Sequence, residues 1–166
     1  MLRILRHLLT PFWVMRLRYP PELLKRIETR VGEIEQRHPG EVRFAVEHAL
    51  ELGDLISGLT SRERALEVFG LLRVWDTEHN NGVLIYVLHA ERAVEIVADR
   101  ALARAVPQTE WDALCRQVET DFRAGRYDAG SMTAIDGAAR LLQQYFPLTA
   151  PAAKARNELP DQPLLL

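Results

Sequence analysis

The sequence has little of what several common functional sites require. It contains one cysteine, Cys115, which excludes an internal disulfide framework and a cysteine-rich zinc site. It has no Gly-rich phosphate loop and no serine in a nucleophile elbow. No apolar run approaches the roughly 20 residues that a membrane-spanning helix needs, and no cleavable signal peptide is recognisable. We therefore expect a cytoplasmic protein, at most peripheral to the membrane.

What is present is the composition of an ordinary folded domain. Hydrophobic residues make up 48% of the 166 residues and charged residues 27%, so one domain can bury a proper core. The formal net charge is −2, which argues against nucleic acid as a partner. We expect three parts: a basic N-terminal segment (1–19), a folded domain (20–147) and a mostly irregular, Pro-containing tail (148–166) whose final leucines could dock on the domain.

Charge is distributed unevenly along the chain. Residues 1–18 contain four arginines and no acid, giving +4, so the remainder carries −6. Two interpretations are open. Arginines mixed with Leu, Phe and Trp suit a segment that binds an anionic membrane surface or a membrane protein. Alternatively, Phe12 and Trp13 pack on the domain while the arginines remain solvated.

Hydrophobic periodicity predicts helices and strands within the domain. Apolar residues recur with helical spacing in four segments, which begin near Pro21, Thr60, Trp111 and Met132. The spacing also places Trp75, Trp111 and Cys115 on the buried faces of their helices. Alternation predicts a strand at 41–47, and apolar runs predict strands at 83–88 and 93–98. A helix between the first two strands makes them parallel, and a tight turn makes the last two antiparallel, with 83–88 in the interior. The expected fold is a three-layer α/β/α sandwich around a small mixed sheet.

Polar residues gather where the second strand begins and the third strand ends. If 83–88 pairs with 93–98, the numbers of facing residues sum to about 181. Asn81 then lies opposite Arg100, Asn80 lies near Asp99, and Asp76 enters on the preceding loop. Such carboxylate and amide oxygens are the ligands of Ca²⁺ or Mg²⁺, and an arginine beside them can hold an anion. We therefore predict metal ligands at Asp76, Asn80, Asn81 and Asp99 and an anion-binding role for Arg100.

A purely structural interpretation of the same residues is also open. Asp76 can satisfy backbone amides after the helix, and the two asparagines can supply left-handed turn geometry. Asp99 and Arg100 can form a surface ion pair of little energetic value.

Several sequence blocks resemble the TPM-domain family, which includes plant thylakoid-lumen phosphatase-like proteins and many bacterial proteins. They are Trp75–Tyr86 with its Asn-Asn-Gly, Val94–Arg100, Phe122–Gly125, Tyr127 and Gly130. The resemblance implies an α/β/α sandwich, a divalent cation (usually calcium) near the Asn-Asn-Gly loop, and a disputed acid-phosphatase activity. In other members it implies roles in assembling or repairing membrane complexes. We expect the chain to depart from typical relatives, because no signal peptide or membrane anchor is recognisable in the sequence and Ala101 stands where many have Gly.

Two functions of different classes follow. The first is a binding or assembly module that associates with membrane proteins or the membrane surface. It binds a cation where residues 80–81 meet residues 99–100, a place called the rim below. The second is a metal-dependent phosphatase-type hydrolase, in which the cation polarises the phosphoryl oxygen and Arg100 stabilises developing charge. No evident catalytic residue beyond these carboxylates can be named.

Overall fold

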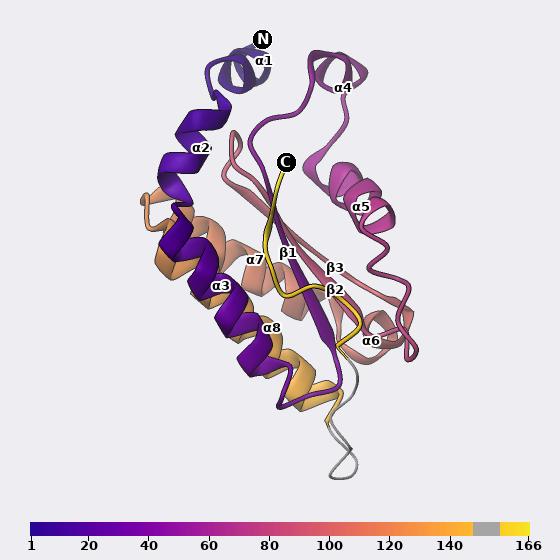
Figure 1. Cartoon of the computed structure of the whole chain (residues 1–166). Helices are drawn as coiled ribbons and strands as arrows, with labels where there is room; N and C mark the ends of the chain where they lie inside the picture. Colours follow the sequence, from indigo (N-terminus) through magenta and orange to yellow (C-terminus); the bar gives the residue numbers. More distant parts are fainter. Residues whose placement is uncertain (148–156) are drawn as a thin grey trace.

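The middle layer of the protein is a four-stranded sheet, seen in a computed structural model that describes residues 1–147 and 157–166 (Figure 1). The strand order is β3-β2-β1-β4. The strands are β1 (Glu41–Glu47), β2 (Gly82–Leu88), β3 (Ala93–Ala98) and β4 (Leu164–Leu165). Residues 148–156, which belong to the predicted tail, lie outside the described residues.

The predicted pairing of the strands is confirmed. β1 and β2 are parallel from Glu41↔Gly82 onward, and β2 and β3 are antiparallel from Val83↔Ala98. All seven residues of β2 are buried, as an interior strand covered on both faces requires.

Helices cover both faces of the sheet, which confirms the α/β/α sandwich. Alternate residues of β2 divide between two cores, because side chains of a strand point to opposite faces. Val83, Ile85 and Val87 join the core under helices α3 (Pro21–Ile34), α7 (Gln108–Arg123) and α8 (Tyr127–Tyr145). Leu84, Tyr86 and Leu88 join the core under α5 (Ser61–Leu71).

The helix signals in the sequence have their expected physical basis. α3 begins with Pro21 at its first position and buries Leu23, Ile27, Val31 and Ile34 on one face. α5 begins with a complete capping box, in which the side chains of Thr60 and Glu63 each accept from the other's backbone N–H.

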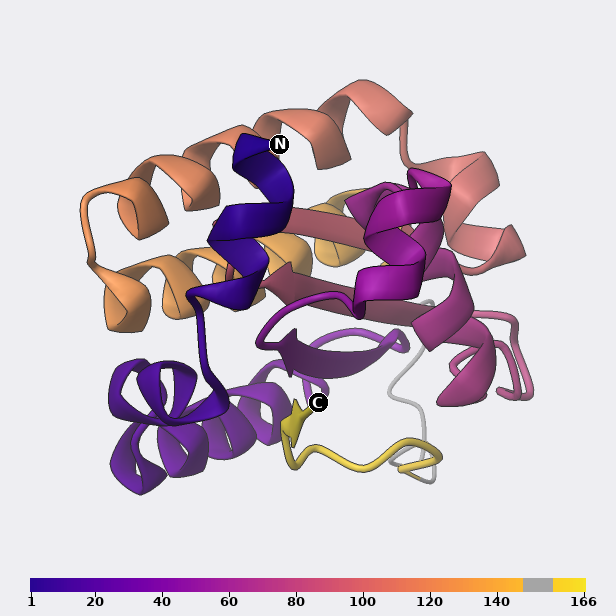
Figure 2. The same cartoon turned by 90° about the horizontal axis from the view of Figure 1, so that it is seen from above.

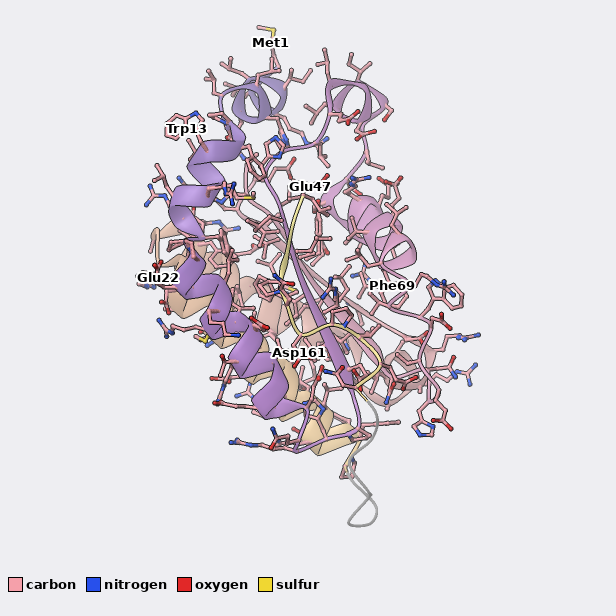
Figure 3. All side chains as sticks on the ribbon, in the orientation of Figure 1. Met1, Trp13, Glu22, Glu47, Phe69 and Asp161 are labelled. Carbon is pink, nitrogen blue, oxygen red and sulfur yellow. The ribbon has the colours of Figure 1, made fainter. Side chains whose placement is uncertain are left out.

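Four short helices were not predicted: α1 (Leu2–Leu8), α2 (Phe12–Arg18), α4 (Leu52–Ser57) and α6 (Arg100–Ala105). Helices of six or seven residues carry too few turns to show a periodic pattern and depend on tertiary contacts. The N-terminal segment does pack on the domain: Met15 and His7 are buried, and the Phe12 ring meets the His48 ring edge-on with a centroid distance of 5.6 Å. Trp13 points outward and is 62% exposed, so the expectation that it packs on the domain is wrong (Figure 3).

The prediction of a buried Trp75 is also wrong. α5 ends at Leu71, and Arg73 adopts a positive φ of 52°, so the helical register is lost before Trp75. Trp75 is 45% exposed, and the centroid of its ring lies 5.8 Å from the Arg73 guanidinium carbon. Trp111, in contrast, is buried as predicted. Cys115 packs against the same core, where burial raises the pKa of its thiol to about 12.

The described part of the tail, residues 157–166, runs beside β1. Leu159 is buried, and Leu164 pairs with Ala45, so the expectation that the final leucines dock is confirmed. The Arg43 guanidinium donates to the carbonyls of Pro160 and Gln162. Across the described ranges, no helix is long and apolar enough to cross a bilayer.

Candidate functional site

The loop between α5 and β2 is shaped around a buried threonine. Thr77 accepts a hydrogen bond from the Asn80 N–H through its carbonyl (3.3 Å) and one from the Asn81 N–H through its hydroxyl (3.1 Å). Asn80 adopts a left-handed conformation with φ 51°, which asparagine tolerates better than most residues. The turn interpretation therefore holds for Asn80.

Asn81 is not a turn residue but a buried one, with 2% of its surface exposed. Its side-chain N–H donates to the carbonyl of Pro39, and its own carbonyl accepts from the Glu41 N–H (3.1 Å). Its Oδ1 atom is buried and has no hydrogen-bond partner among the described residues. A buried polar atom of this kind is uncommon and requires an explanation.

Asp99 is the N-cap of α6 and is only 4% exposed. Its Oδ1 accepts from the Arg100 N–H (2.6 Å), which explains locally why an aspartate precedes this helix. Its main-chain N–H donates to the Gly82 carbonyl (2.9 Å), which extends the β2–β3 ladder by one step. Its Oδ2 is a second buried oxygen without a partner in the described part of the chain.

Arg100 closes the rim on its outer side. Its guanidinium donates to Asn80 Oδ1, its Nε lies 3.5 Å from Asp99 Oδ1, and its side chain is 71% exposed. The Ala101 N–H donates to the Asn80 carbonyl (3.1 Å). The predicted meeting of residues 80–81 with residues 99–100 is thus present in the structure, and the surface-pair interpretation of Asp99 does not fit its burial.

Asp76 lies outside this group. Its carboxylate is half exposed and accepts from the Arg73 guanidinium at 2.6 Å. Among the described residues it accepts no hydrogen bond from a backbone amide, so the structural interpretation of Asp76 is wrong.

The donor set at the rim suits a hard cation. The Oδ1 of Asn81 and the Oδ2 of Asp99 both have unused lone pairs, and Ca²⁺ and Mg²⁺ prefer such oxygens. Within the described residues, no group of three or more His, Cys, Asp or Glu side chains is placed to hold a metal ion. A cation here would depend on amide and main-chain oxygens and on water.

A second polar group was missed by sequence analysis. Glu35, Glu41, His38 and Asp161 line a cavity of about 400 Å³ between α3, the start of β1 and the tail (Figure 3 labels Asp161). Burial, with further contributions from Glu41 and Asp161, raises the pKa of Glu35 to about 9, although it accepts from the Val42 N–H.

Other members of this group are also shifted by burial. Burial raises the pKa of Glu41, whose carboxylate accepts from the N–H groups of Glu158 and Leu159. Burial lowers the pKa of His38 to about 4. The sequence signal was a glutamate at the start of a strand. Glu35, His38 and Glu41 are neighbours in the chain, but Asp161 comes from the distant tail.

Glu35→Gln is expected to remove part of the alkaline loss of stability. The folded state holds the Glu35 proton up to about pH 9, whereas the unfolded chain releases it near the ordinary value of 4.5. The native protein should therefore lose stability as pH rises through this window. Glutamine still accepts from Val42 and does not titrate, so urea unfolding at pH 6 and pH 9 should show a smaller difference. Glu33→Gln, an exposed neighbour, is the control, and an unchanged difference in Glu35→Gln would contradict the assignment.

Comparisons with known proteins agree with the fold. A family model described as the TPM domain matches residues 21–141. Among solved structures, the BA42 protein from the psychrophilic bacterium Bizionia argentinensis, solved by NMR, is similar with a TM-score of 0.72 and 28% identity. The match covers 87% of this chain and 93% of that one. A comparison with curated proteins finds no match.

Proposed function

Because the chain belongs to the TPM-domain family, we propose that it is a binding module that holds a divalent cation, Ca²⁺ or Mg²⁺, at its rim. The rim is the meeting point of residues 80–81 and 99–100. The observation that carries the proposal is that each side of this meeting point has a buried side-chain oxygen with no hydrogen-bond partner among the described residues, Asn81 Oδ1 on one side and Asp99 Oδ2 on the other.

Energetic reasoning supports a cation at this place. A carboxylate that is almost fully buried loses its hydration, and the loss must be offset by hydrogen bonds or by positive charge. The Asp99 Oδ1 atom has the Arg100 N–H, but Oδ2 has no such contact in the described residues. A cation bound to Oδ2 would supply the missing compensation.

The remaining ligands would come from the surface. Ca²⁺ requires about six to eight oxygens, so two buried donors need supplementing. Asn80 and Asp76 are assigned as outer ligands, and each would exchange an arginine partner for the ion. Water would complete the coordination.

Calcium is expected to raise the melting temperature of the native protein. A ligand at 100 times its Kd that binds only the folded state should shift Tm by roughly 5 to 10 °C for a chain of this size. Asp99→Asn should abolish the shift, because asparagine can still cap α6 but carries no charge. The measurement is a melting curve with millimolar Ca²⁺, Mg²⁺ or chelator.

Asp112→Asn, on α7, is the matched control and should retain the full shift. Asn81→Ala and Asp76→Ala should weaken the response. If the native protein melts at the same temperature with calcium and with chelator, the cation proposal is wrong.

A metal-dependent hydrolase of phosphate esters is the second candidate function. The observation that favours it is Arg100, whose exposed guanidinium lies beside Asp99 and can bind an anion by a forked pair of hydrogen bonds. Phosphatase assays on the same samples distinguish the two functions. Metal-dependent turnover that is lost in Arg100→Ala, while its calcium-induced Tm shift remains, would establish the hydrolase over the binding module.

A further inference from the structure

Large apolar side chains are exposed mainly at one end of the molecule. Among the described residues, ten of the thirteen exposed large hydrophobic residues lie on or beside α1, α2 and α4. The members of this group, called the apolar end below, are Met1, Leu2, Leu5, Leu8, Leu9, Phe12, Trp13, Leu17, Leu52 and Ile56. Scattered single apolar residues are normal on a surface, but such a concentration marks an interaction site.

The exposure does not come from a loose N-terminal segment, because hydrogen bonds fix α1 to the domain. Arg3 donates to Glu91 (2.7 Å) and to the Leu59 carbonyl (2.6 Å). His7 accepts from the Leu50 N–H at Nδ1 (3.0 Å), so its Nε2 carries the proton and donates to Glu91 (2.8 Å). Burial alone would raise the pKa of Glu91, but the hydrogen bonds from Arg3 and His7 lower this pKa.

These contacts bring α4 into the same surface as the N-terminal helices. α1 and α4 contact one another and lie side by side in both views (Figures 1 and 2). Leu52 and Ile56, which are distant from α1 in sequence, therefore extend the apolar surface of the first two helices. The sequence alone showed only its N-terminal half.

Positive charge surrounds the apolar side chains. In the described part of the chain, no carboxylate lies within 4 Å of Arg6, Arg16 or Arg18. Arg16 instead lies over the Phe12 ring at 5.6 Å, and its charge stays available at the surface. Glu91 is paired with Arg3, and the acids at α4, Glu51 at its N-cap and Asp54, only partly offset the other three arginines of α1 and α2.

We propose that the apolar end docks on an anionic membrane surface, with Trp13, Leu17 and Ile56 entering the interface and the arginines contacting lipid headgroups. Short helices with apolar side chains and arginines bind bilayer interfaces in this way. The rim lies at the other end of the sheet, since it precedes β2 whereas α4 follows the parallel strand β1. The docking surface is therefore independent of the cation site.

Charge complementarity favours lipid over a second copy of the chain. A symmetric dimer would place the same patch on both subunits and bring arginines against arginines. Like charges that face one another in an interface oppose association, whereas anionic headgroups attract each arginine.

The test is co-sedimentation with vesicles of phosphatidylcholine, alone or with about one third phosphatidylglycerol, in chelator so that the cation site plays no part. The native chain should bind the anionic vesicles, and binding should fall when salt approaches 1 M, where the Debye length is about 3 Å. Arg6→Gln with Arg16→Gln should weaken binding roughly 25-fold, at about fivefold for each arginine.

The decisive pair of variants is Ile56→Glu and Leu71→Glu, because both side chains are 71% exposed but only Ile56 belongs to the apolar end. Ile56→Glu should weaken binding by roughly tenfold or more, and Leu71→Glu should have no effect. Trp13 fluorescence should shift to the blue on binding, and Trp13→Phe should remove that shift. Three outcomes would overturn the proposal: equal binding to neutral and anionic vesicles, equal effects of the two glutamates, or no vesicle binding together with self-association in light scattering.

Discussion

Gly82→Ala is expected to destabilise the protein by about 4 kcal/mol or more, enough to prevent folding in a chain of ordinary stability. A Cβ added to Gly82 would lie 2.0 Å from the Val74 carbonyl oxygen and 2.9 Å from the Val74 Cγ1. The first of these is a backbone atom that cannot rotate away. Relief of the clash would require separating β2 from the chain segment that leaves α5.

The measurement is urea unfolding of Gly82→Ala beside Gly70→Ala. Gly70 lies in α5, and a Cβ added there would meet no atom within 4 Å, so alanine should be neutral or stabilise the helix by up to about 1 kcal/mol. Native-like stability of Gly82→Ala would show that the close approach to Val74 is not required. The Asn-Asn-Gly block therefore needs its glycine for backbone proximity, whereas its first asparagine supplies the left-handed turn.

The sheet could be predicted because its signals are local. The apolar run at 83–88 and the alternation at 41–47 specify strands. The short connection at 89–92 predicts the register of the last two strands, and the observed pairs have this register. That register alone brings residues 80–81 to residues 99–100, so half of the candidate site follows from strand pairing, although the Arg100 guanidinium bonds to Asn80 and not to the facing Asn81. Asp76 differs because its position depends on where α5 ends and on Arg73, neither of which a periodic pattern reveals.

The rest of the molecule is specified by contacts between distant residues. Asn81 and Asp99 each have a buried oxygen without a partner in the part of the chain that the structure describes. Surrounding elements bury these side chains, and burial of a polar side chain carries no sequence signature. The same holds for the apolar end, where α4 is placed by the bonds of His7 and Arg3. Sequence analysis found the charge of residues 1–18 but not the surface to which they belong.

Arg64→Met is expected to cost about 3 to 5 kcal/mol, because it leaves a buried carboxylate without its counter-ion. Glu47, at the end of β1, is 7% exposed and accepts from Arg64 Nε (2.9 Å) and from a second guanidinium nitrogen (2.8 Å). The Tyr86 hydroxyl donates to Oε2 of the same carboxylate, the oxygen that also accepts from Arg64 Nε. The three side chains connect β1, β2 and α5, and burial together with Glu47 raises the pKa of Tyr86.

The pH dependence of the variant separates a lost charge pair from lost packing. Without Arg64, the buried Glu47 should hold its proton at a higher pH in the folded state than in the unfolded chain. Stability of Arg64→Met relative to the native protein should therefore recover as pH falls from 8 toward 5, since protonation removes the unpaired charge. Guanidinium unfolding would mask charge effects, so the measurement is urea unfolding across this range.

Two further variants complete the test. Glu47→Gln combined with Arg64→Met removes both charges and keeps an oxygen for Tyr86, so it should recover most of the lost stability. Glu67 is the exposed partner of Arg64, and half of the Glu67 side chain is in water. Glu67→Gln removes only this partner and should cost less than about 1 kcal/mol. If Arg64→Met is equally destabilised at pH 5 and pH 8 and the double variant is no more stable, the guanidinium contributes through its packing, and the buried charge pair is not what stabilises the junction of α5 with the sheet.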